Sequence, residues 1–375
     1  MNIPFNKPYL SGNELNYMKQ ALRMGQLSGD GLFTKKCHRF FQNRYGFRNV
    51  YLTTSCTGAL EMAAILVDIR PGDEVIAPSY AFVSTANAFS TKGAKVVFID
   101  CLPDIPNIDT AEIEPLITPK TKAIIALHYG GVATDMEPIM ALAKKHKLFV
   151  IEDAAQAIDS YYKGKPLGSI GHLATFSFHE TKNIICGEGG MLAVNDAQFD
   201  KRAEIVWQKG TNRAAFSRGE VEKYEWLDIG SSFLPSDILA AFLYAQLENL
   251  EDIQHKRQHI WKKYYRELKY LEDNEKVKLP FTPDYATNNA HVFYLICRNL
   301  EERSRLIAKL QENGITAIFH YLSLHESPFY KDKHDNRELK NCDRFADCLL
   351  RLPLYYELSD EDLDKIITII KGFYN

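Results

Sequence analysis

Seven short segments rich in β-branched residues recur between residues 49 and 195, and amphipathic segments separate several of them. The predicted strands are Val50–Thr53, Glu74–Ala77, Lys95–Ile99, Ala123–Leu127, Leu148–Glu152, Ala174–Phe178 and Met191–Val194. The predicted helices are Thr57–Val67, Val83–Thr91, Ala111–Leu116 and Met136–His146, the last with Asp135 as its N-cap. Strands that alternate with helices favour a mostly parallel, seven-stranded α/β sheet with helices on both faces. Ligands of such sheets bind beyond the carboxyl ends of the strands.

A different pattern follows residue 235. It predicts one long helix over Asp237–Leu271, strands over His291–Cys297 and Ile315–Phe319, and helices over Arg303–Asn313 and Asp360–Tyr374. Near the N-terminus, Ser11 or Asn13 caps a predicted helix over Glu14–Arg23, and the glycine-rich segment Leu27–Leu32 is predicted to be a loop. A chain of 375 residues is long enough for more than one folding unit. We therefore predict a large domain over residues 1–240 and a smaller C-terminal α+β domain over residues 241–375.

Charge and cysteine content narrow the classes of partner. The net charge is −3, which favours neither nucleic acid nor an anionic membrane. The seven cysteines form no C-x-x-C pair, so we expect neither a disulfide framework nor a metal site. The N-terminal residues lack the pattern of a signal peptide, and no apolar run approaches the ~20 residues of a membrane-spanning helix. We expect a cytoplasmic protein without a nucleic-acid or membrane partner.

Two polar residues after predicted strands are candidates for chemistry. Asp153 follows an apolar strand, and a buried carboxylate there is costly unless a cation or hydrogen-bond donors satisfy it. A protonated pyridine nitrogen would be such a partner, and a helix N-cap is the alternative interpretation. Lys182 lies in a polar turn between a strand and the glycine-rich Gly187–Gly190. A lysine in a cleft can form a Schiff base and move protons, whereas an isolated lysine is more often a surface residue.

Two further segments suggest a bound phosphate and a flat ring. Thr53–Glu61 leads from a strand into a helix, and the N–H groups of a helix N-terminus favour an anion. The Ser177 hydroxyl could donate to the same phosphate. Phe82 follows the next strand, where it could stack on a cofactor ring or belong to the core. An ordinary N-cap is the alternative interpretation of the first segment.

Taken in order, these segments resemble the DegT/DnrJ/EryC1/StrS family of fold-type-I, pyridoxal-phosphate-dependent aminotransferases, from Pro4 to Leu354. The resemblance implies that Lys182 is the Schiff-base lysine and that Asp153 pairs with the pyridine nitrogen. It places Gln156 beside the phenolic oxygen of the cofactor and Phe82 against its ring. The predicted phosphate-binding residues are Cys56, Thr57 and Ser177.

The chain departs from the family pattern at two places. Family members usually have Gly-Thr-Ala where this chain has Cys56-Thr57-Gly58, so the Cys56 side chain is unexplained, whereas its backbone N–H can still bind phosphate. Ser232 stands where the neighbouring subunit of many relatives supplies an Asn to the phosphate. The resemblance implies a homodimer with shared active sites. The candidate substrate-binding residues are Lys209, Arg213, Tyr321 and His325, each alternatively a surface residue, and His179, which alternatively only holds the turn near Lys182.

The resemblance also implies a substrate. The segments Ala141–Gln156, Phe176–Asn183, Lys209–Arg213 and Asp228–Ser232 are most similar to the branch that makes dTDP-4-amino-4,6-dideoxy-D-galactose for enterobacterial common antigen. Such an enzyme transaminates dTDP-4-keto-6-deoxy-D-glucose with L-glutamate, and its cofactor alternates between pyridoxal and pyridoxamine phosphate. The alternatives are a C3-aminotransferase, a C4-aminotransferase that forms the gluco epimer, and a sugar dehydratase, although dehydratase relatives have His in place of Lys182. A non-catalytic relative would have lost Lys182 or Asp153.

Overall fold

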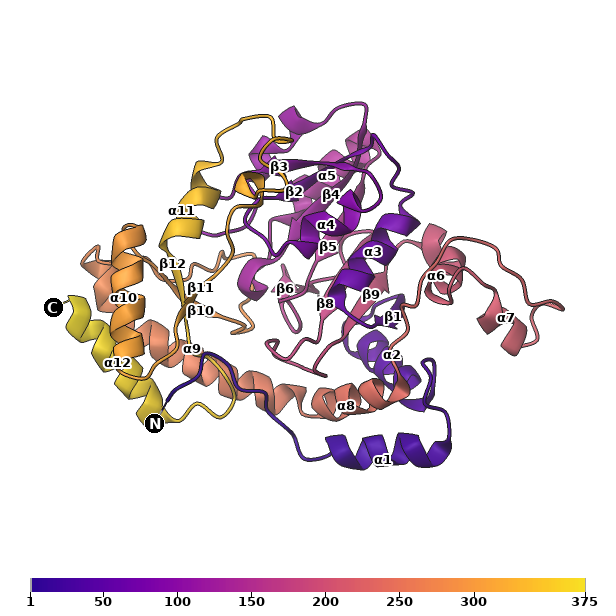
Figure 1. Ribbon diagram of the computed structural model, residues 1–375, viewed down its shortest axis with the longest axis horizontal. Coiled ribbons are helices and arrows are strands. Elements are labelled where there is room, and N and C mark those ends of the chain that lie inside the picture. Colours follow the sequence, from indigo (N-terminus) through magenta and orange to yellow (C-terminus); the bar gives the residue numbers. More distant parts are fainter. Residues whose placement is uncertain (1, 375) are drawn as a thin grey trace.

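A seven-stranded sheet forms the centre of the protein in the computed structural model, which describes residues 2–374 (Figure 1). The strand order is β1-β9-β8-β5-β4-β2-β3. Six strands point the same way and β9 runs opposite to them. All seven predicted strands and the α/β class are therefore confirmed. The strands are β1 (Asn49–Thr53), β2 (Glu74–Pro78), β3 (Lys95–Ile99), β4 (Thr121–Leu127), β5 (Phe149–Asp153), β8 (Leu173–Ser177) and β9 (Gly190–Val194).

Helices cover both faces of this sheet because its strands are apolar on both sides. Neighbouring residues of one strand enter different cores: Val150 packs on one face and Ile151 on the other. One core contains residues of α3 (Cys56–Leu66), α4 (Ser84–Ser90) and α6 (Asp200–Trp207). The opposite core contains residues of α2 (Leu32–Tyr45), α5 (Met136–His146) and α8 (Asp237–Glu248). The site at the carboxyl ends of the strands thus rests on a sheet that is buried on both sides.

Several helix predictions need correction. The predicted helix Ala111–Leu116 is two short 3-10 turns, η1 (Thr110–Glu112) and η2 (Glu114–Leu116), because Pro115 cannot donate a helical hydrogen bond. The predicted long helix is two helices, α8 and α9 (Leu250–Asp273), which meet at Asn249. Asp135 precedes α5 without a capping bond, since its carboxylate accepts from the Tyr162 hydroxyl instead. Neither predicted cap serves α1 (Glu14–Met24), where the Glu14 carboxylate itself accepts the N–H groups of residues 11 and 12.

The helix α2 follows the predicted glycine-rich loop and was not expected from the sequence. The carboxylate of Asp237, at the start of α8, accepts the N–H groups of Phe33 and Thr34 and the Thr34 hydroxyl. It thereby satisfies donors that every helix N-terminus leaves free. A side chain at Gly31 would collide with this carboxylate, since a Cβ there would lie 2.5 Å from it. The start of α2 is therefore fixed by a residue about 200 positions away.

A second, three-stranded sheet forms the C-terminal part of the chain, in the order β10-β12-β11. The helices α9, α10 and α12 pack on a core that also includes Ile3 from the N-terminal segment. The predicted division after residue 240 falls inside α8 and stays a prediction. No helix within residues 2–374 is long and apolar enough to cross a membrane. The elements of this part are β10 (Phe293–Ile296), α10 (Leu300–Glu312), β11 (Ile318–Phe319), α11 (Lys340–Cys348), β12 (Leu349–Leu352) and α12 (Asp360–Tyr374).

Candidate active site

A cavity of about 730 Å³ lies where the carboxyl ends of β5 and β8 meet the N-terminus of α3 and the second sheet. It is large enough for a small-molecule cofactor together with part of a substrate. Phe5 and Asn6 of the N-terminal segment complete its wall. The cavity brings together nine of the residues singled out from the sequence: Cys56, Thr57, Phe82, Asp153, Gln156, Ser177, His179, Lys182 and Tyr321.

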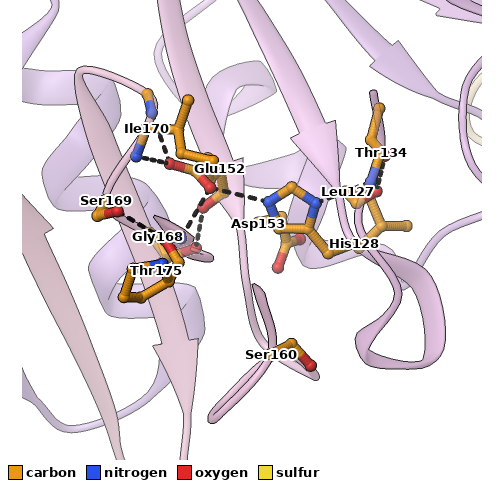
Figure 2. Close-up of polar contacts among 12 residues, drawn as sticks. Leu127, His128, Thr134, Glu152, Asp153, Ser160, Gly168, Ser169, Ile170 and Thr175 are labelled. Carbon is orange, nitrogen blue, oxygen red and sulfur yellow. Dashed lines mark hydrogen bonds and ion pairs between the residues drawn. The ribbon is translucent and has the colours of Figure 1, made fainter. Parts of the chain in front are cut away.

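Two adjacent carboxylates at the end of β5 point to opposite sides because side chains alternate along a strand. Figure 2 shows the network around the first, Glu152. Glu152 accepts from the backbone N–H groups of Gly168, Ile170 and Gly171 at 2.5–2.8 Å. It also accepts from Nε2 of His128 at 2.9 Å, because the Thr134 N–H donates to Nδ1 of that ring and leaves the proton on Nε2. Glu152 therefore ties a loop to the strand.

The second carboxylate, Asp153, faces the cavity. It accepts from the Thr85 hydroxyl at 2.6 Å and from the Ala155 N–H at 3.2 Å. Burial raises the pKa of the Asp153 carboxyl, and the two hydrogen bonds and the Lys182 charge oppose that shift. No cation within residues 2–374 lies at ion-pair distance from Asp153. A buried carboxyl with this shortage of partners fits a ligand that brings its own positive charge.

Lys182 enters the same cavity from the turn that follows β8. Its backbone N–H donates to the His179 carbonyl, which closes this turn. Burial lowers the pKa of the Lys182 amine, and the Arg351 charge lowers it further, whereas Asp153 acts in the opposite direction. A lowered pKa enlarges the neutral fraction of the amine near neutral pH. Neutral amine is the form that attacks a carbonyl carbon.

The N-terminus of α3 lies at another side of the cavity. Ser55 caps this helix by accepting the Gly58 N–H. The N–H groups of Cys56 and Thr57 lie in the first turn and have no partner within the helix. Gly190 permits this arrangement, because a Cβ there would lie 2.4 Å from the backbone nitrogen of Cys56. With Ser177 in the same wall, the region offers donors suited to a phosphate.

Flat and hydroxylated side chains complete the cavity. The Phe82 side chain is 56% exposed, so its ring has a face free for a ligand. Gln156 is buried, accepts the Gly130 N–H and donates to the Tyr321 hydroxyl at 2.8 Å. The Tyr321 ring in turn stacks on the His320 ring with 3.7 Å between centroids. These contacts fix Tyr321 at the cavity wall.

Four residues singled out from the sequence do not line this cavity. Lys209 and Arg213 are exposed, and Ser232 is exposed beside Gln208, with which it forms an isolated bridge. His325 is buried elsewhere, with Nδ1 at 2.7 Å from the Ser79 hydroxyl. Any role of these four in binding stays a prediction.

The structure adds cavity residues that sequence reasoning missed, namely Thr85, His291, Phe319, His320 and Arg351. Thr85 lies in the first turn of α4, only three residues after Phe82, so the position of this helix start could have suggested it. The other four come from the second sheet and the segments beside it. Nothing in their local sequence separates them from core or surface positions.

The profile of the DegT/DnrJ/EryC1/StrS aminotransferase family matches residues 8–371. The chain belongs to this family. It is 32% identical over 381 residues to the spore coat polysaccharide biosynthesis protein SpsC of Bacillus subtilis, with 98% of this chain and 96% of SpsC covered. It is 31% identical to the uncharacterized protein MJ1066 of Methanocaldococcus jannaschii, with 98% and 97% covered.

Solved structures of family members have the same fold. A DegT/DnrJ/EryC1/StrS aminotransferase from Brucella abortus is 30% identical, with a TM-score of 0.87 over 97% of this chain and 96% of that one. The pyridoxal-phosphate form of a putative sugar aminotransferase, Spr1654 from Streptococcus pneumoniae, is 25% identical, with a TM-score of 0.90 over the whole of both chains. This protein is thus a pyridoxal-phosphate-dependent aminotransferase of fold type I.

The groups that line the cavity are themselves suited to that cofactor, independently of the similarity to known proteins. Pyridoxal phosphate combines a phosphate, a basic ring nitrogen and an aldehyde on one flat ring. The cavity offers free N–H groups at the start of α3, the carboxyl of Asp153 without a cation, the Lys182 amine with its lowered pKa, and the exposed ring of Phe82. Each feature of the cofactor therefore has a suitable group in the same cavity.

Proposed function

We propose that this aminotransferase converts a nucleotide-linked 4-keto-6-deoxy sugar, dTDP-4-keto-6-deoxy-D-glucose, to dTDP-4-amino-4,6-dideoxy-D-galactose, with L-glutamate as amino donor. The single observation behind transamination is that Lys182 and Asp153 share one cavity. The sugar and its use in surface polysaccharide or common antigen rest on sequence similarity. The relative SpsC carries the name of a spore coat polysaccharide biosynthesis protein, which supports that class of pathway.

In this proposal, different residues of the cavity bind different parts of the cofactor. Lys182 would hold the aldehyde carbon through Nζ, and Asp153 would keep the ring nitrogen protonated. The phosphate would bind the Cys56 and Thr57 backbone with the Ser177 hydroxyl. Phe82 would stack on the ring, and Gln156 would lie beside the phenolic oxygen.

The catalytic steps follow from the state of these side chains. When bound, the cofactor supplies an electron sink for the carbon that loses its proton. The pKa of Asp153 is raised by burial, and a cationic partner at the ring nitrogen would favour its ionised form. The Lys182 amine, whose pKa is lowered by burial, would take the proton from the α-carbon of the donor through Nζ. Tyr321, held by Gln156, and His179 would contact the sugar.

A homodimer is part of the proposal. The segment 213–229, which includes α7 (Arg213–Ser217), projects from the body of the chain (Figure 1). Its exposed apolar side chains are Phe216, Val221, Tyr224, Trp226, Leu227 and Ile229. Trp226 is 80% exposed, and apolar patches of this kind mark interaction sites. A second copy would cover them, and Ser232, Lys209 and Arg213 would then reach the site of the neighbouring subunit.

The decisive experiment identifies the product. Purified protein with pyridoxal phosphate, L-glutamate and dTDP-4-keto-6-deoxy-D-glucose is expected to give dTDP-4-amino-4,6-dideoxy-D-galactose, assigned by NMR, with an equal amount of 2-oxoglutarate. The gluco epimer would identify the alternative C4 enzyme, and turnover of the 3-keto isomer alone would identify a C3-aminotransferase. Ammonia released without amino transfer would identify a dehydratase and end the proposal.

A further inference from the structure

Two cysteines that lie 241 positions apart in the sequence have their sulfurs in contact. Cys101 follows β3 of the seven-stranded sheet, and Cys342 lies in the first turn of α11, which leads into β12 of the second sheet. The distance between the two sulfurs is 3.3 Å, and both side chains are buried. Among residues 2–374, which include all seven cysteines, no other pair of thiols forms a hydrogen bond. The contact is therefore particular to this pair.

A single carboxylate holds the two cysteine backbones side by side. Oδ1 of Asp100 accepts the Cys101 N–H at 2.9 Å and the Cys342 N–H at 2.8 Å. Its Oδ2 accepts the Asn341 N–H at 3.1 Å, and the Asn341 side chain donates to the Cys101 carbonyl at 2.8 Å. Asp100 thereby supplies acceptors to the first turn of α11, since Leu339, which precedes this helix, has no side chain that could accept them. The backbone bonds therefore bring the two sulfurs together without help from the thiols.

The arrangement of the two thiols is suited to a disulfide bond. A disulfide joins its sulfurs at about 2.05 Å, so the sulfurs of Cys101 and Cys342 need to approach by about 1.3 Å. Small rotations about the Cα–Cβ bonds supply a movement of this size. The hydrogen bond with Cys101 raises the pKa of the Cys342 thiol, and burial raises it further. The pair therefore stays as two neutral thiols as long as it is buried.

An oxidant reaches these thiols only when the first turn of α11 opens. A buried neutral thiol is inert, because the thiolate is the nucleophile. Lys340, the first residue of α11, is exposed, and Asn341 is half-buried, so the pair lies directly beneath a turn at the surface. The ends of helices open locally at a lower free energy than the core of a protein. Opening of this turn releases its N–H groups from Asp100 and exposes Cys342 to solvent.

We propose that Cys101 and Cys342 are a reversible redox pair, which hydrogen peroxide converts to a disulfide bond that fastens α11 to β3. One thiolate attacks a peroxide oxygen, the O–O bond breaks, and the leaving hydroxide takes up a proton to become water. The attacking sulfur is then a sulfenic acid. The second thiol attacks this sulfur, and a second water leaves. One S–S bond replaces two S–H bonds, and the peroxide takes up the two electrons and two protons that the thiols lose.

The bond acts next to the cavity without lining it, since neither cysteine belongs to the cavity wall. The helix α11 continues directly into β12, which brings Arg351 to the cavity. The Phe345 ring of α11 lies 5.7 Å from the ring of Tyr80, two residues before Phe82. The bond therefore fastens a helix whose neighbours carry residues of the cavity wall. Because a crosslink between distant residues restricts the unfolded chain, the melting midpoint of the oxidised holoenzyme should rise by about 5 °C.

Peptide mapping of the peroxide-treated holoenzyme identifies the bond. Trypsin separates the relevant thiols, because Cys101 lies in residues 96–120, Cys342 in residues 341–344 and Cys348 in residues 345–351. After alkylation of the remaining thiols and digestion without reductant, mass spectrometry should find residues 96–120 linked to residues 341–344, and dithiothreitol should release them. Sulfenic or sulfinic acid on either cysteine without this linked peptide, or no oxidation of the pair, would overturn the proposal.

Cys348→Ser is the matched control, because Cys348 is a buried thiol of the same helix outside the pair. This variant should keep the linked peptide and the reversible rise in melting midpoint, whereas Cys101→Ser and Cys342→Ser should lose both. The wild-type peptide map decides the case in which a Ser variant does not fold. Loss of the linked peptide in Cys348→Ser would name the wrong partner for Cys101. An unchanged melting midpoint of oxidised wild type would show that the bond does not fasten α11.

Discussion

The two sides of β5 carry neighbouring carboxylates with opposite surroundings. Glu152 and Asp153 are 0% and 3% exposed, so burial does not distinguish them. Glu152 accepts from three backbone N–H groups and one imidazole, whereas Asp153 accepts from one hydroxyl and one N–H group. Fixed donors saturate the first and leave the second for a ligand. The number of fixed donors, rather than depth, separates a structural acid from a catalytic one.

The largest expected effect is on the cavity side. Lys182→Ala should lower turnover on the order of 10⁴-fold or more, because it removes both the attachment point and the proton carrier. Its unfolding free energy should be no lower than that of wild-type apoprotein, since an amine that burial disfavours is gone. Steady-state rates and thermal melting measure the two quantities. A variant that melts early but still turns over would reverse the assignment of the two sides.

On the opposite side of β5, a substitution should change the stability of the protein more than its rate of turnover. Glu152→Ala should cost about 3–5 kcal/mol, because it leaves His128 and three buried N–H groups without their acceptor. Chemical denaturation measures this loss. The rate per folded molecule should stay within severalfold of wild type at low temperature. A specific loss of rate with unchanged stability would mean that Glu152 takes part in the chemistry.

Asp153→Asn should lower the rate of turnover but raise the stability of the apoprotein at neutral pH. The rate should fall on the order of 10²-fold, because the ring nitrogen loses the charge that keeps it protonated. The folded pKa of Asp153 is raised above its unfolded value, so the folded state binds more protons between those two values. Stability of the apoprotein therefore falls as pH rises through this window and stays lower at neutral pH. The Asn variant lacks this loss.

Thermal melting of the wild-type and Asp153→Asn apoproteins across the pH range checks the direction of this pH dependence. The Asn variant should melt higher than wild type at pH 7, and the difference should shrink as pH falls toward the ordinary pKa of an aspartate. An Asn apoprotein that is less stable at pH 7 would place Asp153 among the structural acids, beside Glu152.

Thr85→Val should give the smallest effect. It removes the 2.6 Å hydrogen bond that lowers the Asp153 pKa, so that pKa should rise further. We expect a rate loss of about tenfold at neutral pH, the equivalent of one hydrogen bond to a charged group. The acidic limb of the pH–rate profile should move to higher pH, and Thr85→Ser should restore it. An unmoved limb would show that Thr85 only packs against the acid.

Sequence patterns predicted the sheet well because each strand is a compact apolar run between polar turns. They failed at the start of α2, which a distant residue fixes, and at a break inside one continuous helical pattern. Asp237 fixes the start of α2, and Asn249 divides α8 from α9. In the site, Asp153 and Lys182 follow predicted strands, so topology alone brings them to one edge of the sheet. Arg351 reaches that edge from β12, and no pattern within its own segment points there.

The N-terminal segment has a practical consequence. Ile3 pairs with Ile315 beside the second sheet, and the Asn6 side chain donates to the Glu180 carbonyl two residues before Lys182. Phe5 lies on Arg351. An affinity tag fused directly in front of this segment would start close to Phe5 and Asn6, which line the cavity that contains Lys182. For kinetic work, a tag fused after α12, or an N-terminal tag that is cleaved off without residual residues, leaves Phe5 and Asn6 undisturbed in the wall of the cavity.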